Sequence, residues 1–361
     1  MTLDHKELRS QPPAPVMKNE TGLVLRDLFV WSKGNIELQN ENEPLRGASC
    51  QETPRFSVLA ISSILAVATI WSYIATIGLL GWDPHVYYGL LTLKKWSEAY
   101  PFEPTLFLIA TVAHPWSFPS YIFITITIAL SLLLIAFRRL KYSQLDQLIL
   151  IIFFSCSFYG LHFMVAFQRQ FYGIVLFVLA LAGGRGGTLA RVASLFSHLY
   201  TFTLHIFWLV GRLRPSIAAI LSVSVVAVGS LYKRSLASDT AASGLLYGEQ
   251  NFIHLLLKQF LTISFSIIIL LTLEKCGNSL RSIVVSYIAL GVPCMLSPSY
   301  AGLFSRIDYF FLPVIVALWP RHVRSDRVIL YRISLLCFSL IGCYIWIKSN
   351  FLCEVMSYCE F

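Results

Sequence analysis

Charged residues are scarce in this chain. Only 13% of its 361 residues are Asp, Glu, Lys or Arg, against roughly 25% in an ordinary soluble domain. Hydrophobic residues make up 56% of the chain, and the mean hydropathy is +0.68. This composition excludes a soluble globular domain. We expect an all-α, polytopic integral membrane protein, because a helix satisfies its own backbone hydrogen bonds within lipid.

The spacings that mark metal sites are also missing. The eight cysteines are spread along the chain without CxxC or Cys/His spacing, so we expect no metal site. Cys353 and Cys359 are the one pair that could cross-link in an oxidising compartment, and two unpaired tail cysteines are the alternative.

The first 55 residues contain no apolar segment followed by a small-residue cleavage site, so we expect no cleaved signal peptide. They carry seven Lys/Arg and eight Asp/Glu with scattered Pro and Asn. This predicts a largely disordered cytoplasmic tail over residues 1–55. A membrane domain over 56–347 and a C-terminal tail over 348–361 complete the expected organisation.

Apolar runs of about 20 residues predict membrane spans. The clear candidates are residues 56–80, 119–137, 145–165, 166–182, 215–231, 253–273, 280–296, 304–319 and 328–347. Two further segments fit poorly. Residues 104–117 are short and end in HPW, and residues 189–210 are interrupted by SHLYTFTLH. We expect about 9–11 transmembrane helices, with one or two segments re-entrant or broken.

The net charge of +9 is carried by short loops such as FRRLKY and GGRGGTLAR. Short cytoplasmic loops of membrane proteins are enriched in Lys and Arg. The charge therefore indicates orientation, with the N-terminus in the cytoplasm, and we expect no nucleic-acid partner. This orientation places residues 81–103 and 232–252 on the outer face.

Charged groups at membrane depth are costly and often functional. GWDPHVYYGL supplies Asp83 as a candidate general base, with Tyr87 and Tyr88 as a platform for stacking sugars. An interfacial aromatic belt is the alternative. AYPFEPTLF supplies Glu103, for which a helix-capping role is the alternative.

Arg169 in FQRQFYG has a glutamine on each side, and His198 follows in the segment expected to break. A snorkelling boundary arginine and a core histidine are the alternatives. LFSRIDYFFLP supplies Arg306, with Asp308 as a partner that could neutralise it. The expected topology brings Arg306 to the face that holds Arg169. Two guanidiniums, each bidentate toward phosphate oxygens, suit a diphosphate head group.

The ordered set of these motifs resembles the EpsG/Wzy family of exopolysaccharide and O-antigen polymerases. That family shows an Asp followed by Tyr in the first outer loop, Glu-Pro before a short apolar segment, Arg-Gln opening a span, then a His, and late an Arg with Tyr-Phe. The matching residues here are Asp83 with Tyr87, Glu103-Pro104, Arg169-Gln170, His198, and Arg306 with Tyr309-Phe310.

The resemblance implies a GT-C-like glycosyltransferase of the bacterial plasma membrane. It would join undecaprenyl-diphosphate-linked repeat units on the outer leaflet, without a nucleotide sugar, cofactor or metal. Asp83 is the first choice as base and His198 the second, with Glu103 also catalytic. The substrate-binding residues would be Arg169, Gln170, Arg306, Tyr87, Tyr88 and Tyr309. Besides the lipid-linked donor and acceptor, a chain-length regulator and a flippase are candidate partners.

Three other functions are consistent with the sequence. A transporter or flippase of a lipid-linked saccharide fits the broken element, although no internal repeat is found. A GT-C transferase that uses a polyprenyl-monophosphate sugar fits WDPHVYY equally well. A membrane acyltransferase with a His/Arg site is the third.

Overall fold

The structure is a computed structural model of the whole chain. The residues that it describes are 58–76, 82–93, 95, 104–113, 116–165, 168–198, 201–211, 213–224, 249–274, 278–295 and 298–348. All of them lie within Phe56–Phe361, which its contacts join into one unit. The expected N-terminal tail and residues 349–361, with Cys353 and Cys359, lie outside the described residues.

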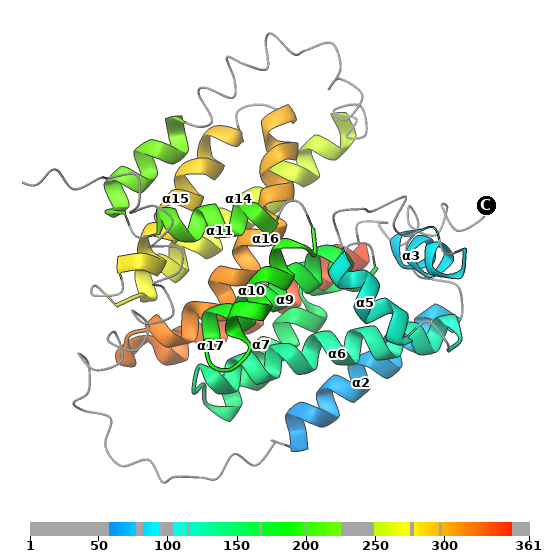
Figure 1. The fold of residues 1–361 in the computed structure, drawn as a ribbon. Helices are drawn as coiled ribbons and strands as arrows, with labels where there is room; N and C mark the ends of the chain where they lie inside the picture. Colours follow the sequence, from blue (N-terminus) through cyan, green and yellow to red (C-terminus); the bar gives the residue numbers. More distant parts are fainter. Residues whose placement is uncertain are drawn as a thin grey trace, which may run out of the picture. The chain divides into compact units, whose positions relative to one another are not determined.

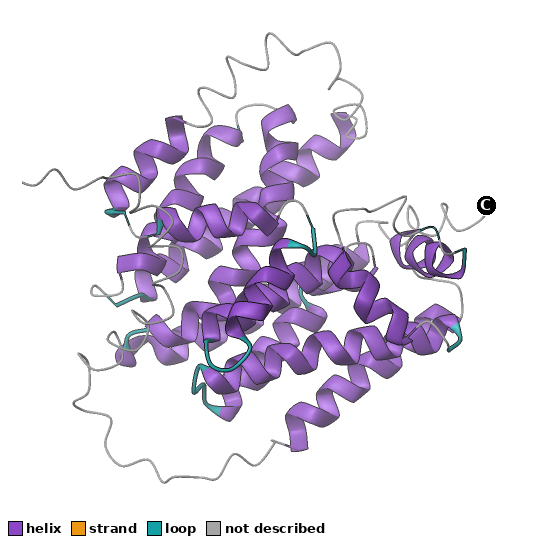
Figure 2. Ribbon diagram, viewed as in Figure 1, coloured by secondary structure: helices purple, strands orange, loops and turns teal. Residues whose placement is uncertain are grey.

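The described residues are almost entirely helical and contain no β-strand (Figures 1 and 2), which confirms the all-α expectation. The helices are α2 (Val58–Thr76), α3 (Trp82–Thr92), α5 (Pro104–Ala113), α6 (Phe118–Arg139), α7 (Gln144–Cys156), α8 (Phe158–Val165), α9 (Gln168–Ala182), α10 (Gly187–Leu195), α11 (Thr201–Val210), α14 (Glu249–Thr272), α15 (Asn278–Cys294), α16 (Pro298–His322) and α17 (Val328–Lys348). A short helix at Pro215–Ser224 and a 3₁₀ turn at Ser325–Arg327 complete the set.

Three helical stretches of the described chain are long and apolar enough to cross a membrane, namely Val58–Thr76, Phe118–Arg139 and Ser325–Tyr344. The bent pair α7 and α8 makes a fourth if it is one span. These helices indicate a membrane protein.

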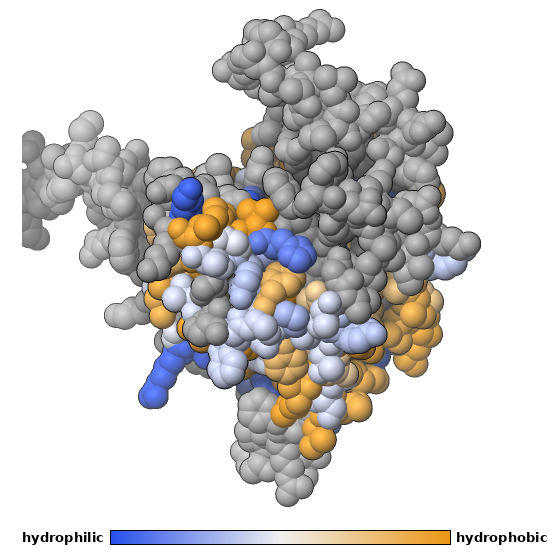
Figure 3. Space-filling view, turned by 90° about the vertical axis from the view of Figure 1, so that its right-hand side faces the viewer, coloured by the Kyte–Doolittle hydropathy of each residue, from blue (hydrophilic) through white to orange (hydrophobic). Residues whose placement is uncertain are grey.

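Helix α2 shows how the bundle presents apolar surface outward. Its buried residues recur every three or four positions, at Ala60, Ile64, Ala68, Trp71 and Ala75. They face α6, and the alanines allow the two backbones to approach closely. The opposite side exposes large apolar side chains, including Leu59, Leu65 and Ile70. Figure 3 shows similar apolar patches on the face that it draws. An outward apolar face of this kind suits contact with lipid.

The continuous helix expected over residues 145–165 is interrupted at Ser157, where α7 and α8 meet at a bend of 59°. Ser157 is fully buried, and its Oγ accepts a hydrogen bond of 3.2 Å from the Gly160 N–H. The serine thus caps α8, satisfying a backbone donor that the break exposes at depth.

Gly160 is required for this bend. A Cβ atom at position 160 would lie 2.5 Å from the backbone carbonyl of Phe154, which cannot rotate away. We expect Gly160→Ala to lower the free energy of unfolding by at least about 2 kcal/mol. Thermal unfolding of the purified protein in detergent measures this. The matched control is Gly89→Ala in α3, where the added Cβ has no atom within 4 Å. Equal melting temperatures for the two variants would contradict the packing argument.

The two segments that fit poorly as membrane spans form short helices, and the second of them is divided in two. Residues 104–113 form α5, and residues 189–210 are divided between α10 and α11. The two elements meet, because the Thr105 Oγ1 donates to the Ala193 carbonyl at 2.8 Å and the Thr105 N–H donates to the Phe196 carbonyl at 3.4 Å. The first turn of α5 thereby satisfies carbonyls at the end of α10, where a helix leaves its last carbonyls without partners of its own.

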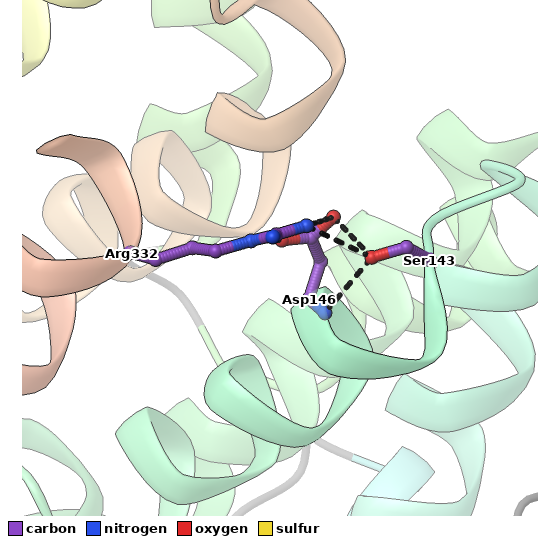
Figure 4. A network of polar contacts seen from close by, with 3 residues as sticks. All are labelled: Ser143, Asp146 and Arg332. Carbon is purple, nitrogen blue, oxygen red and sulfur yellow. Dashed lines mark hydrogen bonds and ion pairs between the residues drawn. The ribbon is translucent and has the colours of Figure 1, made fainter. Parts of the chain in front are cut away.

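One anchoring contact joins two of the basic loops expected on the cytoplasmic side. Gly183, Gly184 and Gly186 adopt positive φ, and Arg139 donates to the Gly183 carbonyl at 2.9 Å. A separate network joins the start of α7 to α17 (Figure 4). Its members are Ser143, Asp146 and Arg332, with the Arg332 Nε donating to Asp146 at 2.9 Å. This network ties α7 to α17 and includes none of the predicted site residues.

Candidate functional site

Arg169 lies in the first turn of α9, where the helix dipole disfavours a cation. Its Nε donates to the Tyr87 hydroxyl of α3 at 2.7 Å, and its Cζ lies 5.3 Å from the centre of the Tyr87 ring. Tyr87 is only 1% exposed, so the guanidinium is held by a fixed ring. An arginine that opposes the helix dipole is not there to stabilise the helix. Together with the backbone N–H groups of the same turn it forms a centre of positive charge suited to an anion.

The two glutamines beside Arg169 have polar atoms that are buried and unsatisfied within the described part of the chain. Gln168 is 3% exposed and accepts a hydrogen bond of 3.3 Å from the Tyr121 hydroxyl at its Oε1. Its Nε2 has no partner among the described residues, and neither does the Oε1 of Gln170. Leaving such atoms unpaired costs about 1–3 kcal/mol each. They are therefore positions where a polar ligand or water would be stabilised.

His198 lies in the turn between α10 and α11, outside the helices that qualify as spans, and is 8% exposed. Its ring lies 5.8 Å from the Phe310 ring of α16. Burial and, to a smaller extent, the nearby charge of Arg169 together lower the pKa of His198 to about 4. The structure thus brings His198 and Arg169 into one electrostatic environment, and the imidazole is neutral at pH 7.

The depressed pKa of His198 has a stability consequence. Because the folded pKa lies below the unfolded value of about 6.5, its contribution is present above pH 6.5 and is lost as the pH falls toward 4. We expect the melting temperature to fall over this interval, and less steeply in His198→Gln. Thermal unfolding in detergent between pH 4 and 7 checks this. Parallel curves for the two proteins would contradict it.

Tyr88 lies on the neighbouring part of α3 and is half-buried. Its hydroxyl donates to the Trp116 carbonyl at 3.0 Å, and its ring meets Phe118 and Tyr121 edge to face. His85 stacks on Phe118 at 4.2 Å between ring centroids. This aromatic cluster lies next to the Arg169–Tyr87 pair, because Tyr121 also contacts Gln168.

Three predicted site residues have side chains outside the described residues. Asp83 belongs to the first turn of α3 and Arg306 to α16, but their side chains lie outside the described residues. Glu103 immediately precedes α5 and is itself outside the described residues. Their expected roles stay predictions.

A second polar cluster is built around Asp308, which is 1% exposed in α16. It forms an ion pair of 3.3 Å with Lys258 of α14. Tyr159 of α8 donates to the Asp308 Oδ2 at 2.5 Å, and Tyr287 of α15 donates to its Oδ1. The Tyr159 hydroxyl also lies 3.2 Å from the Thr262 hydroxyl. Four helices therefore meet at one buried carboxylate.

Tyr309 belongs to this second cluster and is 8% exposed. The Lys258 ammonium lies 3.9 Å from the centre of its ring, and His162 stacks on it at 4.6 Å between centroids. In this arrangement the ring contacts protein groups, and its expected stacking on a sugar stays a prediction.

Lys258, Tyr159 and Tyr287 are not among the site residues predicted from the sequence. Lys258 had a signal, since it is a lone cation within the span expected at residues 253–273. The two tyrosines had none, because each lies in an apolar run where a buried tyrosine is ordinary.

A small hollow between α9, α11, α15 and α16 is lined only by apolar side chains, among them Phe177, Trp208 and Phe311. It offers no polar group to a phosphate or a sugar. Among the described residues no group of three His, Cys, Asp or Glu side chains could hold a metal ion. Comparison of the chain with protein-family models, curated proteins and solved structures found no match.

Proposed function

We propose that this protein is a polysaccharide polymerase of the bacterial plasma membrane, acting on O-antigen, exopolysaccharide or capsule repeat units. It joins undecaprenyl-diphosphate-linked oligosaccharides on the outer leaflet and has a GT-C-like arrangement of about 9–11 transmembrane helices. Its N-terminus is cytoplasmic and its active site faces outward. The support is the ordered set of motifs that resembles the EpsG/Wzy family, together with the surroundings of Arg169.

The observation that carries the proposal is the placement of Arg169. It combines a guanidinium, the positive end of α9 and the unsatisfied Gln168 Nε2 donor in one turn, whereas the unsatisfied Gln170 Oε1 is an acceptor and suits a hydroxyl of the saccharide. A lipid diphosphate offers the complementary chemistry, since it is doubly anionic and rich in acceptor oxygens. Tyr87 fixes the plane of the guanidinium, so little reorganisation is needed when charge develops on the leaving group.

In the proposed reaction, a hydroxyl of the acceptor repeat unit attacks the anomeric carbon of the donor. A new glycosidic C–O bond forms, the bond from that carbon to the diphosphate breaks, and undecaprenyl diphosphate leaves with the electron pair. Arg169 and Arg306 neutralise the leaving group. Asp83 takes the hydroxyl proton, with His198 or Glu103 as the other candidates. His198 with a pKa of about 4 is better suited to accepting a hydrogen bond than to removing a proton.

A transporter or flippase of the same lipid is the second candidate. It is favoured by the interruptions between α10 and α11 and at Ser157, because discontinuous helices are common at transport sites. A GT-C transferase that uses a polyprenyl-monophosphate sugar is the third. Both share the requirement for a lipid phosphate near Arg169.

The deciding experiment supplies purified protein in detergent with an undecaprenyl-diphosphate-linked repeat unit and separates the products by size. A polymerase lengthens the saccharide, whereas a flippase leaves it unchanged. A parallel reaction offers the monophosphate-linked sugar as donor. The melting curve of the protein shows whether it is folded. If folded protein yields only single repeat units, the polymerase function is rejected.

A further inference from the structure

The Lys258 ammonium lies in a cage of aromatic rings and a carboxylate. Its Nζ is 3.9 Å from the ring centre of Tyr309, 4.9 Å from that of Phe158 and 5.6 Å from that of Tyr159. The Asp308 Oδ2 is 3.3 Å away. Aromatic faces with a nearby carboxylate are the elements with which proteins bind ammonium ligands. Here the ligand is a side chain of the protein itself.

The cage contains more contacts than a single ion pair. A buried pair alone is often no more stable than well-packed apolar residues. Here the carboxylate also accepts hydrogen bonds from the hydroxyls of Tyr159 and Tyr287. Helices α14, α15 and α16 follow one another in the chain, and α8 joins them from about 100 residues earlier. These contacts are directional, so together they constrain where α16 lies at Asp308.

This position is linked to the candidate site by consecutive residues. Asp308 and Tyr309 contact Lys258, and Phe310, the next residue, lies against the His198 ring at 5.8 Å. Arg169 in turn acts electrostatically on His198. A shift of α16 at Asp308 would therefore move Phe310 relative to His198.

We infer that Lys258 and Asp308 are positioning residues: Lys258 is a tethered ammonium ligand whose cage holds Asp308, Tyr309 and Phe310 of α16 against His198. The cage is defined by the contacts of Lys258 and does not depend on the proposed function. Its effect on catalysis rests on the proposed polymerase function.

Chemical rescue tests the cage without any activity assay. Lys258→Ala removes the ammonium and leaves room for n-propylammonium, and n-propanol is the neutral control of similar size. We expect n-propylammonium to raise the melting temperature of Lys258→Ala, and n-propanol to leave it unchanged. Neither compound should affect the wild type. An equal response to both compounds, or no response, would overturn the inference.

Lys258→Ala leaves Asp308 buried without its partner, and the variant is therefore prepared in n-propylammonium if it does not fold alone. Failure to fold with the compound present would also overturn the inference. Lys258→Ala/Asp308→Asn serves as the matched control, because it removes both charges and keeps an acceptor oxygen for one of the two tyrosines, while its amide NH2 can donate to the hydroxyl of the other. We expect it to fold and to show no response to n-propylammonium. A response of this double variant equal to that of Lys258→Ala would mean that the carboxylate is not part of the cage.

The effect of Lys258 on catalysis is measured by extension of the lipid-linked repeat unit. We expect Lys258→Ala to lose at least about tenfold in kcat with KM changed by less than about twofold, and n-propylammonium to restore kcat. An unchanged kcat would overturn the positioning role. If the wild type itself does not extend the saccharide, the proposed function fails, and the stabilisation by n-propylammonium still decides whether the cage binds a cation.

Discussion

Arg169→Ala is expected to abolish chain extension, with kcat/KM falling by about 10³-fold or more. The variant removes the guanidinium that Tyr87 orients and that the first turn of α9 places beside Gln168 and Gln170. The leaving diphosphate then lacks its neutralising group in the transition state. The measurement is extension of the purified lipid-linked repeat unit, supported by the ladder of surface polysaccharide in a complemented deletion strain.

Two controls separate this effect from general loss of charge. Arg169→Lys keeps the charge and loses the planar fork, so we expect activity between those of the wild type and Arg169→Ala. Arg185→Ala removes an exposed arginine from the glycine loop after α9 and should leave activity unchanged. Arg306→Ala and Asp83→Asn in the same strain test the other expected roles. A normal ladder in Arg169→Ala at wild-type membrane levels would identify Arg169 as a snorkelling boundary residue.

The second large effect concerns stability. Asp308→Ala leaves the Lys258 ammonium and the hydroxyls of Tyr159 and Tyr287 without the acceptor that they share. Removing one partner of a buried ion pair costs about 3–5 kcal/mol, so we expect a large fall in the melting temperature in detergent. Asp308→Asn keeps an acceptor oxygen and should cost less.

The matched control for Asp308→Ala is Asp326→Ala. Asp326 pairs with Arg324 and Arg327 at the surface, and its side chain is 53% exposed. An exposed pair contributes at most about 1 kcal/mol. A loss for Asp308→Ala no larger than that for Asp326→Ala would show that the buried cluster does not stabilise the bundle.

The helices themselves could be predicted because apolar runs are local properties of the chain. Helix α6 differs by only a few residues from the span expected at 119–137, and the division of residues 189–210 followed from their polar centre. The break at Ser157 could not be predicted in the same way. It depends on a serine that caps α8 and on Gly160 lying against the Phe154 carbonyl, and both contacts need the folded chain.

The same distinction between local and tertiary information applies to the candidate site. Composition and motif order were enough to indicate a membrane protein and to select Arg169, Tyr87 and His198 as candidates, because a charged or polar group in an apolar run is conspicuous by itself. Only the tertiary structure decided which groups meet. Arg169 contacts Tyr87 from 82 residues away, and Asp308 lies among Lys258, Tyr159 and Tyr287 from three other helices. Pairing between distant segments depends on how the helices pack, and hydropathy along the chain contains no information about it.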